Sequence, residues 1–197
     1  MYGGKTAEVI IIIIMITIIL IYFKTIKYEV TYVKSDIDNN KYLVRDIKDK
    51  ERAANMLARI KLNILTLNNY LVQNKDKYHN FNIYITRLND RIHYTLFNES
   101  TPDSVYTSYS VNKGDQLVFC LRSKKKKDQI HDLNLLMYVA LHEIAHIACP
   151  EEGHTELFKQ IFAFFAQIAI QLGLYQKMPF DEKPEEYCGL IIYESII

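Results

Sequence analysis

The sequence contains no tryptophan, only three cysteines in 197 residues, and almost no net charge, +1 at pH 7. The missing tryptophan accompanies abundant Ile, Lys, Asn and Tyr, a bias that carries no information about mechanism. Cys120, Cys149 and Cys188 lack both C-x-x-C spacing and the density of a disulfide scaffold, which favours a reducing compartment. The balanced charge excludes a global field that would recruit nucleic acid or acidic substrates. A partner must therefore be inferred from a local site.

Apolar residues make up 49% of the chain, which is long enough for one domain with a hydrophobic core and too short for two. Changes in composition and periodicity divide it into four parts. We expect a short tail at 1–8, a transmembrane helix at 9–23, a linker or strand region at 24–44 and one folded domain at 45–197.

Residues 9–23 read VIIIIIMITIILIYF and are apolar except for one threonine. As a helix they would reach about 22 Å, so the bilayer of about 30 Å would have to thin or flanking lysines would have to snorkel. A secretory signal peptide is disfavoured because no A-x-A-like cleavage site follows Phe23. A buried strand or helix is disfavoured because nothing nearby would cover so uniform a run. We therefore predict a single transmembrane helix.

The charges around this segment predict its orientation. Lys24, Lys27 and Lys34 follow it, whereas only Lys5 and the amino terminus precede it. The positive-inside rule then places the large domain on the cytosolic or virion-interior side. The glycosylation sequon at 98–100 would support the opposite topology, but so short a pattern often arises by chance.

The following residues alternate between strand-like and helix-like patterns. The period-two stretch at 28–33, YEVTYV, predicts a strand, and apolar residues at helical spacing predict an amphipathic helix over 48–74. Residues 82–92 fit either structure. A hairpin is predicted over 105–122, with Gly114 supplying the positive φ that its turn needs.

A helix that is apolar nearly all round should begin at Asp132, a good N-cap, and end before Pro150. It contains the motif H-E-x-x-H, formed by His142, Glu143 and His146. The two histidines lie about 40° apart around the axis and about 6 Å apart along it, so both can bind one metal ion. A pair of core histidines bonded to backbone carbonyls is the alternative. The metal is favoured because a cation offsets the desolvation cost of all three side chains.

Such a site predicts zinc-dependent hydrolysis. Three protein ligands would leave the fourth tetrahedral position for a water molecule, whose pKa zinc lowers to about 7. Glu143 would take the proton from this water as general base and pass it to the leaving amine.

The third ligand is predicted to be His154. After Pro150 the chain turns at Gly153, and a second helix over 155–173 follows, so this loop can bring His154 back to the first pair. Glu152 and Glu156 are the rivals, and either would give a site of two histidines and one carboxylate. Cys149 is disfavoured because the proline bend should turn it away.

H-E-x-x-H, followed within one short loop by His154 and then by Phe158, resembles the WLM and SprT-like group of small zinc metallopeptidases. The strings PDSVYTSYSVNKGDQLVFCLR, DLNLLMYVALHEIAH and KPEEYCG further resemble WLM-type proteins of large DNA viruses. The likeness extends from about Arg45 to Gly189. It implies an α+β, zincin-like domain with a small sheet beside the active-site helix. It also implies that the strand at 116–122 presents its edge to an extended peptide.

Three functions fit these expectations. The first is a membrane-anchored zinc endopeptidase acting on protein or peptide substrates, with Glu143 as general base. The second is a protease acting on DNA-associated or DNA-crosslinked proteins, as some WLM and SprT-like proteins do, with the lysine run at 124–127 as a phosphate contact. The membrane segment and the lack of a clear DNA-binding region disfavour it. The third is a viral membrane or assembly protein that keeps zinc for folding, which requires four protein ligands.

Overall fold

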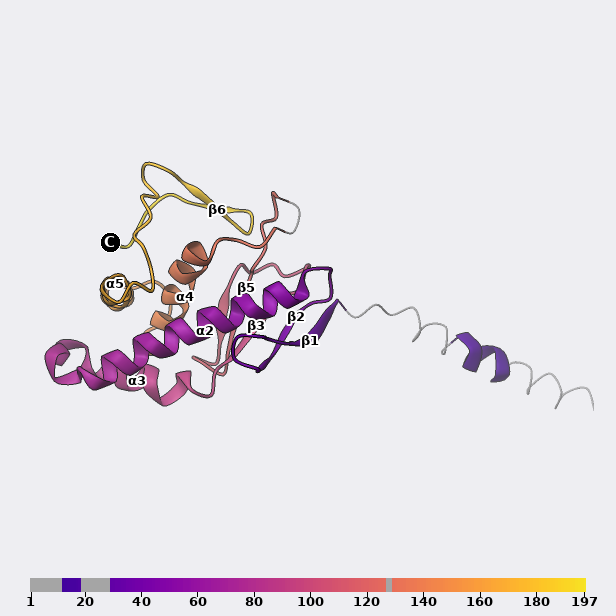
Figure 1. Ribbon diagram of the computed structural model, residues 1–197, viewed down its shortest axis with the longest axis horizontal. Helices are drawn as coiled ribbons and strands as arrows, with labels where there is room; N and C mark the ends of the chain where they lie inside the picture. Colours follow the sequence, from indigo (N-terminus) through magenta and orange to yellow (C-terminus); the bar gives the residue numbers. More distant parts are fainter. Residues whose placement is uncertain (1–11, 19–28, 127–128) are drawn as a thin grey trace, which may run out of the picture.

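The computed structural model describes residues 12–18, 29–126 and 129–197, which form an α+β fold (Figure 1). The long helices are α2 (Lys50–Gln73), α3 (Asn82–Ile92), α4 (Leu133–Ala148) and α5 (Glu156–Gln171), with the 3-10 helix η1 (Lys75–Phe81) between α2 and α3. The strands are β1 (Val30–Lys34), β2 (Lys41–Arg45), β3 (Leu96–Glu99), β4 (Tyr109–Val111), β5 (Gln116–Phe119), β6 (Glu185–Tyr187) and β7 (Leu190–Ile192). In Figure 1, α2 crosses the molecule and the C-terminal hairpin lies above α4.

The described strands form two hairpins and one mixed sheet. Strands β1 and β2 pair antiparallel, as do β6 and β7. The mixed sheet has the order β3-β5-β4, with β3 parallel and β4 antiparallel to β5. The expectation that the strand at 116–122 presents a free edge is therefore wrong, because Leu117 of β5 pairs with Phe97 on one side and Ser110 on the other. Strand β4 takes the edge position.

The helices follow the apolar periodicity of the sequence. The helix predicted over 48–74 is confirmed as α2, whose apolar stripe lies in the core. The ambiguous stretch 82–92 is the helix α3, because Ile85, Leu88 and Ile92 recur at helical spacing and all are buried. The expected N-cap of α4 is also confirmed, since the carboxylate of Asp132 accepts a hydrogen bond from the Asn134 backbone N–H at 2.8 Å.

Helix α4 lies at the centre of the core. Its buried residues occupy every face of the helix: Leu135, Leu136, Met137, Tyr138, Val139, Ala140, Leu141, Glu143, Ile144, Ala145, Ile147 and Ala148. It packs against α2, α3, α5 and β4. Burying one large apolar side chain contributes about 1.5–3 kcal/mol, so these contacts fix α4 firmly in the domain.

A buried ion-pair network joins the first hairpin to the mixed sheet. Arg122, just beyond β5, contacts Glu99 of β3 at 2.7 Å and Asp49, before α2, also at 2.7 Å. The second carboxylate oxygen of Glu99 accepts a hydrogen bond from the Arg45 backbone N–H at 2.8 Å. Strand β2 also places Tyr42 in the same core as the helices.

The cysteines are not all free thiols. Cys120, directly after β5, forms a disulfide with Cys188, which lies between β6 and β7 and is 68 residues away in sequence. Cys149 remains a buried thiol. The expected reducing compartment rested on unpaired cysteines, so this bond removes the basis of that expectation.

The predicted transmembrane helix over 9–23 is wrong. Within that stretch only residues 12–18 are described, and they are helical; the rest lies outside the described residues. Across the described residues, no helix is both long enough and apolar enough to cross a membrane. The single-pass membrane location inferred from the segment has no support there.

The turn between β4 and β5 gives a test of how the sheet packs on α4. Gly114 has a φ of 117°, and a Cβ there would lie 3.2 Å from Ile147 of α4 and 3.3 Å from Cβ of Arg91. Gly173 has a φ of 68°, but its Cβ would meet no atom within 4 Å. We expect Gly114→Ala to lower the free energy of unfolding by about 3 kcal/mol and Gly173→Ala by about 1 kcal/mol, measured by urea denaturation. Equal losses would contradict the close approach to α4.

Candidate metal centre

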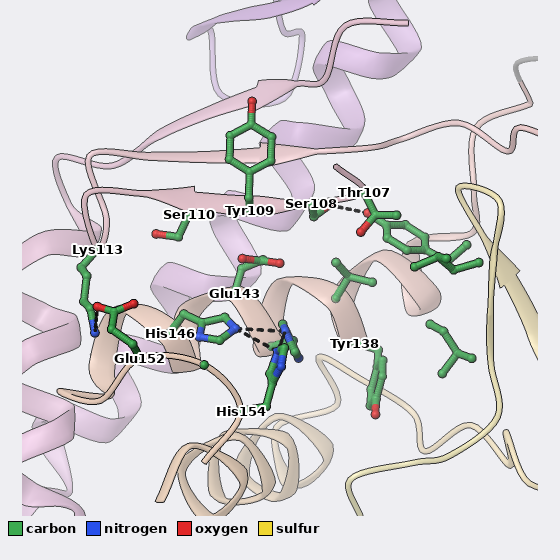
Figure 2. A pocket seen from close by; sticks show the side chains of 16 residues that line it. Thr107, Ser108, Tyr109, Ser110, Lys113, Tyr138, Glu143, His146, Glu152 and His154 are labelled. Atoms are coloured by element: carbon green, nitrogen blue, oxygen red, sulfur yellow. Dashed lines mark hydrogen bonds and ion pairs between the residues drawn. The ribbon is translucent and has the colours of Figure 1, made fainter. Parts of the chain in front are cut away.

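Three histidine side chains converge beside the mixed sheet. His142 and His146 lie one turn apart on α4, and His154 directly precedes Thr155, the N-cap of α5. Their Nε2 atoms form a triangle, with separations of 3.2 Å between His142 and His146, 3.3 Å between His146 and His154, and 3.0 Å between His154 and His142. Figure 2 shows His146 and His154 directed toward one another.

The triangle has the size that one tetrahedral metal ion requires. Zinc–nitrogen bonds of 2.0–2.1 Å at tetrahedral angles place two ligand nitrogens about 3.3 Å apart. A hydrogen bond can join two such nitrogens only where one carries a proton, whereas one cation can bind all three lone pairs. Among the described residues, the cluster of potential ligands at this point consists of these three histidines.

A lysine holds the loop that delivers the third histidine. Gly153 provides the bend with a φ of 79°. Lys113, in the β4–β5 turn, donates hydrogen bonds from Nζ to the carbonyl oxygens of residues 149, 150 and 151 at 3.1, 3.3 and 3.0 Å. It also pairs with the carboxylate of Glu152 at 3.1 Å. The cation thus satisfies carbonyls at the C-terminus of α4 and ties the loop to the sheet.

The rival ligands lie elsewhere. The Glu152 side chain is 89% exposed and faces Lys113 rather than the histidines. Glu156 is exposed and lies 3.9 Å from Lys159. Cys149 is fully buried at the end of α4. Of the alternatives, the structure brings His154 to the pair on α4 and leaves the carboxylates and the thiol outside the cluster.

Burial sets the protonation of the site. It lowers the pKa of His142 to about 3, helped by the neighbouring histidines. Burial, with His154 and Lys113, lowers the pKa of His146 to about 4. Both imidazoles are therefore neutral at pH 7, the form that binds a cation. Glu143 is also buried, which raises its pKa to about 8.

Phe158 supports all three imidazoles. Its ring stacks on His146, with centroids 4.1 Å apart, and meets His142 and His154 edge-on at 4.9 and 5.0 Å. Because Phe158 is buried on α5, its rigid ring fixes the rotamers of the histidines. This contact gives a physical role to the phenylalanine of the motif.

The histidines open into a cavity of about 540 Å³. Edge strand β4 and the residue before it form one wall, with Ser108 and Ser110 lining the cavity. Figure 2 shows Glu143 between this strand and His146. The Ser110 hydroxyl is buried and has no hydrogen-bond partner among the described residues. A substrate could form the hydrogen bond that this hydroxyl lacks.

The C-terminal hairpin completes the cavity. Tyr187 of β6 lines it and forms a hydrogen bond with the Ser108 hydroxyl, and Leu190 and Ile192 of β7 also line it. Burial raises the pKa of Tyr187, as does the nearby Glu143, so its hydroxyl stays protonated at neutral pH. The sequence patterns missed these residues and Lys113, because no local pattern shows which distant segments meet α4.

Other candidate residues lie away from this cavity in the described part of the chain. The remaining histidines, His79, His93 and His131, are not among its lining residues. The lysine run at 124–127 is described only in part, since residues 127 and 128 lie outside the described residues.

Comparisons with known proteins identify viral relatives. No protein-family profile matches the chain, and no solved structure matches it. It is similar to "Uncharacterized protein 136R" of Invertebrate iridescent virus 6, at 42% identity over 84 residues, and to "Uncharacterized protein 042R" of Invertebrate iridescent virus 3, at 38% over 84 residues. These stretches cover 41% and 42% of this chain and 44% and 50% of the relatives.

A longer match comes from Acanthamoeba polyphaga mimivirus. "Uncharacterized protein R325" is 46% identical over 186 residues, which cover 94% of both chains. The resemblance to WLM and SprT-like peptidases stays a prediction, because none of these names describes an activity. The chain belongs to the same family as the mimivirus protein R325.

Proposed function

We propose that this protein is a zinc-dependent endopeptidase, with His142, His146 and His154 as metal ligands. The observation that carries the proposal is the triangle of Nε2 atoms with sides of 3.0–3.3 Å beside a buried glutamic acid. Three candidate ligands among the described residues would leave one coordination position of zinc open, which is typical of catalytic rather than structural zinc. This favours an enzyme over a protein that uses zinc only for folding.

His142, His146 and His154 would hold the zinc, which would supply Lewis acidity toward a substrate carbonyl group and a water molecule. The carboxylate of Glu143 then accepts a proton from the attacking water and delivers it to the leaving amine. Burial alone favours the neutral form of Glu143, whereas a nearby positive charge favours its carboxylate. Its position between β4 and His146 supports this role, because a peptide lying along β4 would pass next to Glu143 (Figure 2).

Strand β4 supports a peptide as the substrate. It is paired with β5 on one side and has no strand partner on the other among the described strands. An extended peptide can add to such an edge through main-chain hydrogen bonds, independent of its sequence. Since Ser108 and Ser110 line the same cavity as Glu143, a peptide on this edge would pass the histidines.

The identity of the third ligand can be tested by metal binding. We expect the full chain to bind one zinc ion and His154→Ala to weaken binding by more than about a hundredfold, since residues that only support a ligand cost 10–100-fold. Glu156→Gln should bind as wild type does, because that carboxylate lies outside the cluster. Competition with a chromophoric chelator measures both affinities. Loss of binding in Glu156→Gln but not in His154→Ala would contradict the assignment.

The role of Glu143 predicts a separation of binding from catalysis. Glu143→Gln keeps the shape of the side chain but removes the proton acceptor, so zinc content should be unchanged and kcat should fall by about 10²–10⁴-fold. Cleavage of unfolded casein, followed by gel electrophoresis and mass spectrometry, measures the loss. Activity equal to wild type, or activity of metal-free protein, would overturn the proposed function.

Lys113 is expected to position the ligand loop without touching the metal. Lys113→Met removes three hydrogen bonds and one ion pair, so zinc affinity should fall roughly tenfold. Lys113→Arg should restore part of this affinity because it keeps the charge. Lys159→Met is the matched control, since that exposed lysine forms an ion pair with Glu156, at 3.9 Å, and forms none with the described residues of the ligand loop. Unchanged affinity in Lys113→Met would show that the loop holds its place without this contact.

A further inference from the structure

The C-terminal hairpin turns one apolar face toward the metal centre. In its antiparallel register Tyr187 lies opposite Leu190, and Glu186 lies opposite Ile191. Side chains alternate along a strand, so Leu190 and Ile192 share the face of Tyr187, whereas Ile191 points to the other side. Tyr187, Leu190 and Ile192 line the cavity, and Leu190 is 59% exposed.

The hairpin forms one wall of the cavity, and several contacts fix it to the rest of the domain. The Cys120–Cys188 disulfide attaches it to the end of β5. Further contacts join it to the rest of the chain, among them the hydrogen bond between the Ser108 and Tyr187 hydroxyls and the one from the Ser123 hydroxyl to the Glu186 carboxylate. Glu186 also accepts a hydrogen bond from the Gly189 backbone N–H at 2.7 Å, which closes the turn. The apolar face is therefore held in place before any substrate binds.

The wall lies at one end of the cavity. Helix α4 adds Tyr138 and Val139, one turn before His142, to the same lining. Figure 2 shows Tyr138 on one side of the labelled histidines, and Lys113 with Glu152 on the other. The cavity thus has an apolar end at the hairpin and a polar end at the ligand loop.

The direction of β4 indicates which part of a bound peptide would lie at this apolar end. Ser108, just before β4, contacts the hairpin, whereas Val111, at the end of β4, leads to Lys113. Antiparallel strand pairs outnumber parallel ones two- to threefold, so a peptide on this edge is expected to run opposite to β4. The part of the peptide that follows the reacting bond then meets the hairpin.

From this arrangement we infer that the hairpin selects the substrate: Leu190 and Ile192 bind a large apolar side chain (Leu, Ile, Phe or Met) of the residue directly after the cleaved bond. The inference rests on the proposed function, because it requires the metal centre to cleave peptides. An apolar side chain placed there leaves water together with Leu190, so both surfaces contribute to binding.

The first experiment uses full-length wild-type protein with zinc and unfolded casein. New N-termini identified by mass spectrometry should be enriched in large apolar residues. A peptide spanning one mapped site is then synthesised with Leu, Phe, Gly, Asp or Lys at that position. We expect kcat/KM for Leu and Phe to exceed that for Gly and Asp by roughly 10–100-fold.

The second experiment changes the wall. Leu190→Asp and Ile192→Asp should reduce the preference for Leu over Lys at least about tenfold, because they place a charge against the apolar side chain. Leu190→Met should retain it. Ile191→Asp, on the opposite face of the same hairpin, is the matched control and should keep the wild-type preference. Zinc content, melting temperature and oligomeric state, measured for each variant, separate altered specificity from altered folding or assembly.

The outcomes are distinguishable. If wild type cleaves neither casein nor the peptides, both the proposed function and the selective wall are overturned. Three other outcomes would overturn the inference about the hairpin but leave the proposed function standing. Wild type could cleave with no apolar preference after the bond, it could show the preference before the bond, or Leu190→Asp could keep the wild-type preference. A Leu190→Asp variant that changes only the oligomeric state would instead identify this face as a contact between copies, which also overturns the inference.

Discussion

Helix α4 carries two imidazoles and a carboxyl group inside an apolar core, and the free-energy cost of burying them depends on what surrounds them. The neighbouring helices and β4 fix its position, while Phe158 of α5 packs against the imidazoles. The low pKa of His142 follows from the same burial. A cation binding at the three nitrogens would offset this cost, so the packing that isolates the site also favours metal binding there.

Two segments that are distant from this helix in sequence complete the site: β4 with the turn that follows it, and the C-terminal hairpin. The β4–β5 turn holds the ligand loop through Lys113, β4 provides an edge beside Glu143, and the C-terminal hairpin closes one end. The Cys120–Cys188 disulfide and the Ser108–Tyr187 pair connect the hairpin to the sheet that carries the edge. Loss of the hairpin would therefore remove one wall of the cavity and also the hydrogen-bond partner of Ser108, just before β4.

The parts of the fold that depend on local patterns could be predicted from the sequence. The limits of α4 follow from the cap at Asp132 and the bend before Pro150, and i, i+4 spacing places His142 and His146 together. Pairings between distant segments could not be predicted, because strands of three to five residues carry too little pattern to specify their partners. The edge strand, the disulfide and the hairpin wall were therefore missed. The transmembrane helix predicted at 9–23 rested on composition alone, and no helix among the described residues is long and apolar enough to cross a membrane.

The distribution of charge in the cavity bears on how it would recognise a substrate. Lys113, the nearby cation, is paired with Glu152 and donates hydrogen bonds to three carbonyl oxygens, and burial alone favours the neutral form of Glu143. The chain as a whole carries a net charge of +1. Apart from a bound metal ion, neither the whole molecule nor the side chains of this site would create a strong field for long-range attraction. Recognition would depend on main-chain pairing with β4, which tolerates many sequences, and on apolar contact with the hairpin, which discriminates among them.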